Sequence, residues 1–342
     1  MHKYTILLLI FLFGCSQKKI KNIQLTPSFY FWKTTFNLSG AEVDLLKKTG
    51  ASPMYIRFFD IDWQPGQGAV PVAQLEIGSL GFIPKNIVPV IFITNRTMKK
   101  TAGKDIALLA DRILKKIAYI ADKFSISVHE VQFDCDWTES SRQHFFDLIK
   151  AIKQENQGII ISSTLRLHQY RYPQKTGIPP VDKVMLMFYN MGEVSNINEP
   201  NSILNLAKAR PYIEGAKPYP IPLDIAVPIF GWGALFREGK LINLLKGIKG
   251  KDLKDPLRFT KTDETHFDVI KDTYLEGNYL YKNDQIRLEE VSETLLLKTV
   301  PLLRQVINQP KTCIAFYHLD ISSQKEFSNA TIRHFFNQIQ EK

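Results

Sequence analysis

The sequence is poor in cysteine, with three among its 342 residues: Cys15, Cys135 and Cys313. No group of cysteines and histidines has the spacing of a zinc site, so we expect no metal centre. Cys135 and Cys313 each lie in an apolar, strand-like run, and a chain of this length does not need a disulfide to fold. We therefore expect two buried free thiols, with one bridge between them as the alternative.

The sequence also lacks an apolar run long enough to cross a bilayer, which takes about 20 residues. Residues 4–13 are nearly all apolar and follow a short basic start, a pattern typical of a secretory signal. Residues 12–15, Leu-Phe-Gly-Cys, resemble the lipobox of bacterial lipoproteins, in which the cysteine is acylated and becomes the first mature residue. The resemblance implies a signal peptide at residues 1–14 and a lipid on Cys15. An uncleaved anchor or a plain secretory signal is the alternative.

Residues 15–22 are polar and rich in lysine, and we interpret them as a tether to a domain at residues 23–342. Several acyl chains, at about 0.8 kcal/mol per buried methylene, would make the anchoring stable. No acidic run follows Cys15, of the kind that sends some lipoproteins to the cell surface. The expected location is the cell envelope, with the domain lipid-anchored to a bacterial membrane and facing the periplasm.

No nucleic-acid-binding motif is present, although 44 Lys and Arg against 34 Asp and Glu give a formal net charge of +10. Many of the lysines lie between residues 237 and 261. A solvated lysine-rich face explains this surplus, and an anionic lipid or glycan partner is the alternative. For an exported domain we expect no nucleic acid and no cofactor, and we expect a monomer.

Eight near-continuously apolar runs alternate with helical or loop segments, as in parallel strands buried on both faces. Amphipathic spacing predicts helices at residues 40–48, 105–124, 138–156, 202–209 and 328–339. The alternation predicts an α/β fold, a (β/α)8 TIM barrel, irregular where the second, fifth and sixth strands lack a long helix after them. A doubly wound open sheet is the alternative, but the count of eight and the absence of a glycine-rich phosphate loop disfavour it. The expected strands are residues 29–32, 52–63, 87–94, 130–137, 158–168, 183–190, 223–232 and 313–320.

The segment at residues 233–311 is too long for one barrel helix, so we expect an insertion between strands seven and eight. Residues 278–281 and 285–288 are strand-like and flank Lys-Asn-Asp, which predicts a β-hairpin. Residues 292–308 predict a helix that is kinked or broken near Pro301.

Strand four carries the strongest candidates for catalysis, because the working residues of such barrels sit at the carboxyl ends of strands. Gln132, Asp134 and Asp136 alternate with apolar residues, so their side chains share one face at steps of about 6.6 Å. Two nearby carboxylates push one another's pKa apart, which favours one acid and one base. The alternative is structural: these acids pair with Arg57 or Arg166 and fill a polar barrel.

Polar and aromatic residues at the other strand ends are predicted to bind substrate. Trp232 and Trp63 could stack on sugar rings, since an aromatic face suits the apolar face of a sugar. Packing or an internal ion pair is the alternative for each residue. The aspartates at strand ends could instead gather Ca²⁺ or Mg²⁺, although no loop has calcium-binding spacing. The substrate-binding candidates are Arg57, Asp60, Asp62, Arg166, His168, Tyr189, Asn190, Trp232, His318 and Asp320.

The polar face of strand four, Gln132-x-Asp134-x-Asp136, resembles the Asp-x-x-Asp-x-Asp-x-Glu motif of family 18 glycoside hydrolases, the chitinase-like enzymes. Residues 187–190, Met-Phe-Tyr-Asn, resemble the Met-x-Tyr-Asp of that family's strand six, and residues 226–231 resemble its Gly-x-Pro-x-Tyr-Gly. The resemblance covers strands four to eight in order, and it implies a barrel fold and a glycan partner. The chain is also similar to an uncharacterised group of bacterial barrel lipoproteins with Asp-x-Asp on strand four.

Two positions depart from the family's pattern, since Asp136 replaces its catalytic glutamate and Asn190 replaces an aspartate. Aspartate is shorter by about 1.5 Å, and a displacement near 1 Å can cost about a hundredfold in rate. Glu139 could supply a longer acid only if the strand end bulges. One hypothesis is a glycoside hydrolase with Asp136 as general acid and Asp134 as its partner. The other is a non-catalytic glycan-binding or envelope-assembly lipoprotein on a decayed hydrolase barrel.

Overall fold

The computed structural model describes residues 23–78, 81–320 and 327–341. The predicted signal peptide at residues 1–14 and the tether at residues 15–22, with Cys15, lie outside the described residues. Within the described ranges, no helix is both long and apolar enough to span a bilayer.

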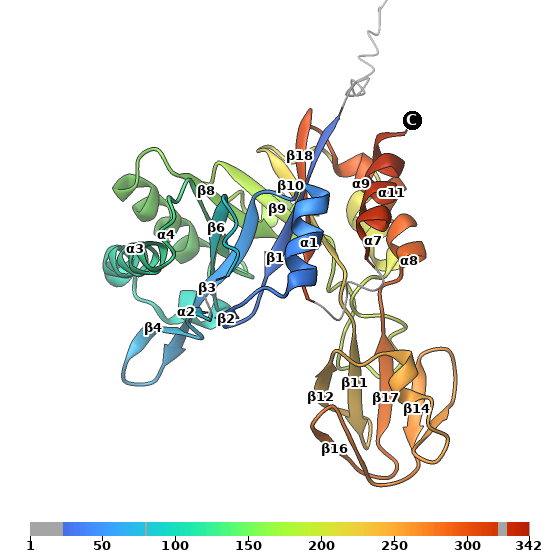
Figure 1. The fold of residues 1–342 in the computed structure, drawn as a ribbon. Helices are drawn as coiled ribbons and strands as arrows, with labels where there is room; N and C mark the ends of the chain where they lie inside the picture. Colours follow the sequence, from blue (N-terminus) through green and yellow to red (C-terminus); the bar gives the residue numbers. More distant parts are fainter. Residues whose placement is uncertain (1–22, 79–80, 321–326, 342) are drawn as a thin grey trace, which may run out of the picture.

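Eight parallel strands close into a barrel, which confirms the predicted fold (Figure 1). The strands follow the order β1-β18-β10-β9-β8-β7-β6-β3, and β1 closes the ring by pairing with β3. Because all eight run in the same direction, their carboxyl ends meet at one end of the barrel, which we call the mouth. The barrel strands are β1 (Gln24–Phe31), β3 (Met54–Gln64), β6 (Ile87–Ile93), β7 (Glu130–Asp134), β8 (Ile160–Leu165), β9 (Lys183–Met187), β10 (Leu223–Pro228) and β18 (Lys311–Tyr317).

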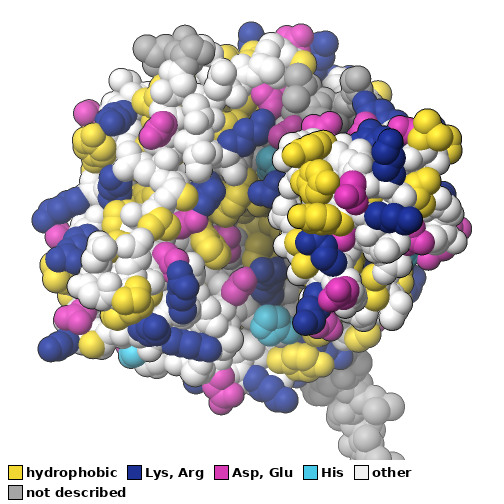
Figure 2. Space-filling model, turned by 90° about the horizontal axis from the view of Figure 1, so that it is seen from below, with side chains coloured by type: hydrophobic (Ala, Val, Ile, Leu, Met, Phe, Trp, Pro, Cys, Tyr) yellow, Lys and Arg dark blue, Asp and Glu magenta, His cyan; other side chains and the backbone are white. Residues whose placement is uncertain are grey.

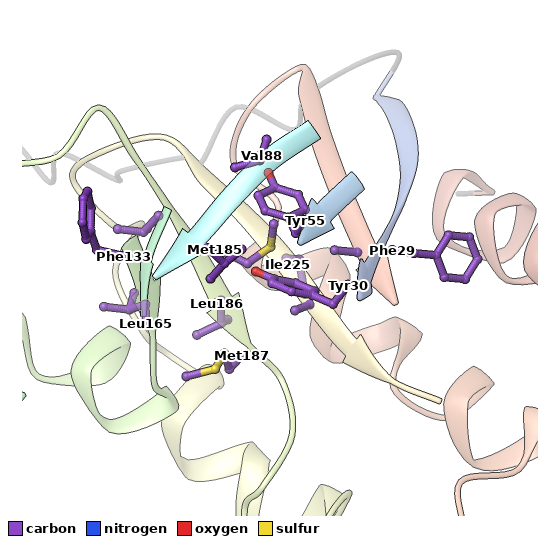
Figure 3. Packing of buried hydrophobic residues seen from close by; sticks show 14 of the residues in the cluster. Phe29, Tyr30, Tyr55, Val88, Phe133, Leu165, Met185, Leu186, Met187 and Ile225 are labelled. Atoms are coloured by element: carbon purple, nitrogen blue, oxygen red, sulfur yellow. The ribbon is translucent and has the colours of Figure 1, made fainter. Parts of the chain in front are cut away.

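Successive side chains of a barrel strand point alternately into the barrel and out toward the helices. Figure 3 shows this alternation at β1, where Tyr30 lies inside with Tyr55 and Met185, whereas Phe29 points away. The rings of Tyr30 and Tyr55 are stacked, with centroids 5.0 Å apart. Large buried side chains therefore fill the interior, so a ligand has to bind at the mouth.

The covering helices form where the apolar spacing predicts them. Helix α3 (Ile106–Lys123) buries one apolar stripe and packs beside α4 (Arg142–Glu155). The barrel is irregular after β3, where strands replace a helix, and after β8, where two short helices follow. The remaining elements around the barrel are β2 (Thr35–Phe36), α1 (Gly40–Thr49), β4 (Gly68–Val72), β5 (Glu76–Ile77), α2 (Asn95–Lys100), α5 (Leu167–Arg171), α6 (Pro173–Thr176), α7 (Leu206–Ile213) and α11 (Asn329–Gln340).

The insertion after β10 is present as predicted, but its strands pair differently. Residues 278–281 and 285–288 do flank a turn, in which the Tyr281 N–H donates to Asp284 Oδ2 at 2.8 Å. The two strands do not pair with one another, because β17 takes a central place where Ile286 and Leu288 enter the insertion's core. Strand β16 pairs with β15 instead. The insertion contains β11 (Trp232–Arg237), β12 (Lys240–Lys246), β13 (Phe259–Lys261), β14 (His266–Val269), β15 (Thr273–Leu275), β16 (Asn278–Leu280) and β17 (Gln285–Glu289).

Two helices lead from the insertion back to the barrel. The helical structure is interrupted between α8 (Glu293–Leu297) and α9 (Val300–Val306), and Pro301 lies in the first turn of α9. Proline is tolerated in a first turn, where its missing N–H would have no partner in the helix. The predicted break near Pro301 is confirmed.

A buried ion pair fastens the insertion to the loop that follows β9. Arg287 Nε donates to Glu289 Oε1 at 2.9 Å, and both residues are buried. The Arg287 guanidinium also donates to the carbonyl oxygens of Val194 and Asn196. Glu289 Oε2 accepts hydrogen bonds from the backbone N–H and the hydroxyl of Ser202, at 2.5 and 2.7 Å. The Arg287 guanidinium and Glu289 Oε2 therefore join β17 of the insertion to the loop after β9.

Gly231 lies where the chain leaves the barrel for the insertion, and we expect alanine there to destabilise the protein. A Cβ atom at this position would lie 2.6 Å from the carbonyl oxygen of Glu289 and 3.3 Å from the Cα of Glu290. Backbone atoms cannot rotate away, so Gly231→Ala should lower the free energy of unfolding by about 1 to 3 kcal/mol. Thermal melting measures the change. Gly250→Ala is the matched control, since its Cβ would meet only side-chain atoms at 3.6 and 3.7 Å. An equal loss in the control would contradict this account.

Candidate active site

The mouth of the barrel lies beside the insertion. In Figure 1 the strands open toward the lower end of the barrel, where the insertion extends away from it. Figure 2 views this end and shows the molecule hollowed between the barrel and the insertion, with hydrophobic, acidic, basic and histidine side chains around the hollow. Active sites of such barrels lie at the mouth.

Asp134 is the last residue of β7, and 9% of the residue is exposed. Its Oδ1 accepts a hydrogen bond from the Thr164 hydroxyl at 2.7 Å, and no described residue donates to its Oδ2. Burial, and next the charge of Asp136, raise the pKa of Asp134 to about 6. Asp134 is therefore a carboxyl group that exchanges a proton near neutral pH, as general acids do.

Asp136 lies two residues further along the chain, close enough for its charge to act on Asp134. Arg166 holds Asp136 in a bidentate ion pair, with Nε 2.5 Å from Oδ1 and Nη2 2.6 Å from Oδ2. The Asp136 side chain is 42% exposed. The pairing with Arg166, considered from the sequence as the structural alternative, thus holds for Asp136 and not for Asp134.

Gln132, the third member of the predicted polar face, is fully buried deeper in the barrel. Its Oε1 accepts a hydrogen bond from the Tyr30 hydroxyl at 2.6 Å. Its Nε2 has no hydrogen-bond partner among the described residues. Toward the mouth, β7 thus presents a buried amide and a protonatable carboxyl group, and the ion-paired carboxylate of Asp136 follows two residues after the strand ends.

The two predicted aspartates of β3 lie in different surroundings. Arg57 Nε donates to Asp60 Oδ1 at 2.6 Å, and the charge of Asp60 also acts on Asp134. Asp62 instead accepts a hydrogen bond from Arg96 Nε at 2.6 Å, and the side chain of Arg96 is 61% exposed. The hydrogen bond from Arg96 contributes most to lowering the pKa of Asp62 to about 2. Asp60 therefore belongs to the site, whereas Asp62 belongs to an ion pair at its rim.

Aromatic rings cluster at the mouth. Tyr189 stacks on Tyr317 with centroids 5.0 Å apart, and Trp32 lies 5.7 Å from Tyr317. Phe230 lies 5.5 Å from Tyr317 and 5.2 Å from Trp232. The sequence predicted Tyr189 and Trp232 but missed the other three. A signal was present, since each of the three stands at or just past the end of a barrel strand.

Electrostatic coupling joins this aromatic cluster to Asp134. Burial, above all, raises the pKa of Tyr30, Tyr189 and Tyr317 well above the ordinary value. The charge of Asp134 adds to the rise at all three hydroxyls. The tyrosines stay neutral hydrogen-bonding groups at neutral pH, and they share one site with the carboxyl groups.

Two predicted residues, His168 and Asn190, form no hydrogen bond with the carboxyl groups of this site. Strand β8 ends at Leu165, so His168 is exposed on helix α5 and does not lie in a strand, as the prediction for residues 158–168 had it. Asn190 is exposed just after β9 with φ of 53°, a left-handed conformation that asparagine tolerates better than most residues.

Two further predicted residues border the aromatic cluster. His318 is half-buried with its ring 5.5 Å from that of Tyr317, and Asp320 pairs with Lys33 at 3.2 Å. The Nδ1 of His318 and the Nε1 of Trp232 are buried without hydrogen-bond partners among the described residues. Unsatisfied buried polar atoms in a site are available to a ligand or a water molecule.

No group of three or more His, Cys, Asp or Glu residues in the described part of the chain is arranged to hold a metal ion. Of the strand-end aspartates considered as calcium or magnesium ligands, Asp60, Asp62, Asp136 and Asp320 pair with arginine or lysine instead. The two thiols are free, and Cys135 is buried whereas Cys313 is only partly buried.

Likeness to known proteins was sought among protein-family models, curated proteins and solved structures. No protein-family model matches it, and no curated protein matches it. Among solved structures it is similar to the spore cortex-lytic enzyme SleL of Bacillus cereus, at 13% identity over 94% of this chain and 75% of that chain, with a TM-score of 0.53. It is also similar to a chitinase of Chromobacterium violaceum, at 11% identity over 91% of this chain and 98% of that chain, with a TM-score of 0.50. At these identities the likeness shows the fold alone: the chain has a barrel similar to the barrels of these two enzymes.

Proposed function

We propose that the chain is a glycoside hydrolase that binds a glycan at the barrel mouth and uses Asp134 as its general acid. One observation carries the proposal: Asp134 is a buried carboxyl group with a pKa near 6, beside a charged carboxylate and a cluster of aromatic rings. Glycosidic bonds are commonly cleaved by two carboxyl groups, one that protonates the leaving oxygen and one that stays charged.

In the proposed reaction, Asp134 gives its proton to the glycosidic oxygen as the bond from that oxygen to the anomeric carbon breaks. The sugar then develops positive charge, which the carboxylate of Asp136 stabilises while Arg166 holds it in place. Water adds to the anomeric carbon, and its proton returns to Asp134. These roles are the reverse of those expected from the sequence, because Arg166 holds Asp136 in a bidentate ion pair whereas Asp134 has no ion pair.

The proposed substrate is an envelope glycan or an imported glycan. Rings such as Trp32 and Trp232 offer stacking surfaces for sugars, and the buried ring nitrogens of His318 and Trp232 are available for hydrogen bonds. The similar solved structures are a spore cortex-lytic enzyme and a chitinase. Peptidoglycan and chitin are therefore the first substrates to test.

The test is an activity screen with the full chain on purified peptidoglycan, chitin oligosaccharides and a panel of other glycans. Release of reducing ends measures cleavage, and retention on each polymer measures binding. We expect saturable cleavage of one of these glycans. A folded protein that cleaves none of them would overturn the hydrolase proposal.

Non-catalytic glycan binding is a second candidate function, and one observation favours it. Arginines engage Asp60, Asp62 and Asp136, so Asp134 is the carboxyl group among these four that lacks an ion pair. Binding by the wild type without turnover, and unchanged in Asp134→Asn, would support this function instead.

We also propose that Cys15 carries a lipid that holds the domain at a bacterial membrane, in the cell envelope and facing the periplasm. Support comes from the signal-like residues 1–14 and the lipobox-like residues 12–15. Strand β1 starts at the end of the barrel opposite the mouth, so an anchored chain would present its mouth away from the membrane (Figure 1). We propose that it acts as a monomer, without nucleic acid.

Cys15→Ser is expected to remove the lipid, because acylation needs the cysteine thiol. In the wild type, mass spectrometry should find an acylated peptide beginning at Cys15, and detergent partitioning should place the protein in the detergent phase. Cys313→Ser is the matched control and should keep both properties. A wild-type chain that retains residues 1–14 without a lipid would contradict the anchor.

A further inference from the structure

Three exposed tyrosines cluster on the insertion, away from the mouth. Tyr274, Tyr279 and Tyr281 are 68%, 41% and 49% exposed. The ring centroids of Tyr274 and Tyr279 are 4.9 Å apart, and those of Tyr279 and Tyr281 are 4.8 Å apart. Neighbouring aromatic rings left in water commonly mark a binding surface. We call these three residues the tyrosine cluster.

A hollow of about 360 Å³ adjoins the tyrosine cluster at Tyr281. Arg237 donates to both carboxylate oxygens of Asp284, at 2.8 and 2.9 Å, and its guanidinium lies 4.2 Å from the centre of the Tyr281 ring. The turn that joins β11 to β12 supplies Glu238, and the turn before β17 supplies Asn283. The hollow therefore places Glu238, Asn283 and the Arg237 guanidinium beside the Tyr281 ring, while the buried carboxylate of Asp284 holds Arg237 in place.

The charges around the hollow cancel. Arg237 and Lys282 contribute two positive charges, and Glu238 and Asp284 contribute two negative charges. A ligand that is polar but neutral suits such a lining, whereas an anionic lipid surface would gain no net attraction. Sugars have this chemistry, because their hydroxyl groups pair with carboxylates, amides and guanidinium groups while their apolar faces stack on tyrosine.

The position of the tyrosine cluster also disfavours a membrane as its partner. The tip of the insertion lies at the opposite end of the molecule from the start of β1, which follows the proposed anchor (Figure 1). A chain held at Cys15 would therefore direct this tip outward, toward polymers rather than toward its own membrane.

We propose that the tyrosine cluster and the adjoining hollow form a second glycan-binding surface, distinct from the barrel mouth. The surface holds one stretch of a polysaccharide while another stretch reaches the mouth, which raises the local concentration of chain at the site. Binding at this surface needs no turnover at Asp134.

The test measures retention of the full chain on insoluble chitin and on purified peptidoglycan. The double variant Tyr274→Ala/Tyr281→Ala should bind one of these polymers about tenfold more weakly, the change expected when stacking on two rings is lost. Tyr119→Ala is the matched control, since Tyr119 is 51% exposed on α3, and it should bind like the wild type. Tyr281→Phe keeps the ring and should also retain binding.

Further measurements distinguish glycan binding at this surface from binding at the mouth and from binding to a membrane. Asp134→Asn should still be retained by the polymer, so a loss of cleavage alone leaves the second surface intact. Equal retention of the double variant and the wild type would overturn the proposal, as would no retention of the wild type on either polymer. Vesicles of phosphatidylethanolamine and phosphatidylglycerol should bind both proteins equally. Loss of vesicle binding in the double variant would overturn the glycan assignment.

Discussion

Asp134→Asn should lower the rate of glycan cleavage by about 100- to 10,000-fold, because general acid catalysis contributes a factor of this size. Asparagine has nearly the same shape, and its amide oxygen can keep the hydrogen bond that the Thr164 hydroxyl donates at 2.7 Å. The amide has no proton to give at the pH of the reaction, so binding should persist while cleavage is lost. Initial rates and polymer retention measure the two effects separately.

The same variant should be more stable than the wild type at neutral pH, which separates lost chemistry from lost fold. Folding raises the pKa of Asp134 from 3.8 to about 6, so the folded state disfavours the charged carboxylate. Stability is therefore lost as the pH rises from about 3.8 through about 6. At 1.36 kcal/mol per pKa unit, the free energy of unfolding of Asp134→Asn should exceed that of the wild type by roughly 2 to 3 kcal/mol at pH 8. Near pH 3 the two proteins should be equally stable. An inactive variant that melts earlier than the wild type at pH 8 would contradict the assignment.

Arg287→Met should destabilise the protein by about 3 to 5 kcal/mol, among the largest losses expected from a single substitution here. The change leaves the buried carboxylate of Glu289 without its cation and two loop carbonyls without their donor. Chemical denaturation measures the loss. Because Arg287 holds the loop after β9, which begins beside Tyr189, the variant should also bind glycan more weakly.

Two companion variants test the cause of that loss. Arg287→Met/Glu289→Gln should recover part of the stability, because the glutamine oxygen can still accept from Ser202 and no charge stays buried. Arg210→Met removes an exposed pair with Glu214 and should change stability by less than about 1 kcal/mol. If Arg287→Met lowers the free energy of unfolding as little as Arg210→Met does, the buried network does not hold the insertion.

The barrel could be predicted from the sequence because its strands are buried on both faces. Continuous apolar runs mark such strands without any knowledge of their partners, and the eight runs correspond to the eight barrel strands. The pairing inside the insertion could not be predicted in the same way. Strand β17 pairs with β11 and β14, where Ile286 is buried in the insertion's core. The turn before β17 carries no signal of these partners.

The candidate site could be predicted where the side chains of a strand alternate between its two faces, because this alternation decides where each side chain points. Asp134 and Asp136 came from that alternation, but their different roles did not, since these depend on Thr164 and Arg166 across the neighbouring strand. His168 was misplaced because residues 166–168 continue the alternation of polar and apolar side chains past the end of β8 and into helix α5. The alternation does not distinguish a strand end from a first helical turn.

The aromatic cluster was missed for a related reason. Trp32 and Tyr317 each look like ordinary core residues in sequence, and only the closure of the barrel brings β1 and β18 side by side. The predicted barrel does place the first and last strands side by side, but which of their aromatic residues reach the mouth depends on where each strand ends.

The pH dependence of kcat/KM, measured for the wild type and for Asp136→Asn, tests the central assignment most directly. Because cleavage needs Asp134 protonated, activity should fall as the pH rises through about 6. The charge of Asp136 is one cause of the raised pKa, so in Asp136→Asn the fall should move to lower pH. Activity that rises through this range, or a fall that Asp136→Asn leaves in place, would contradict Asp134 as the proton donor.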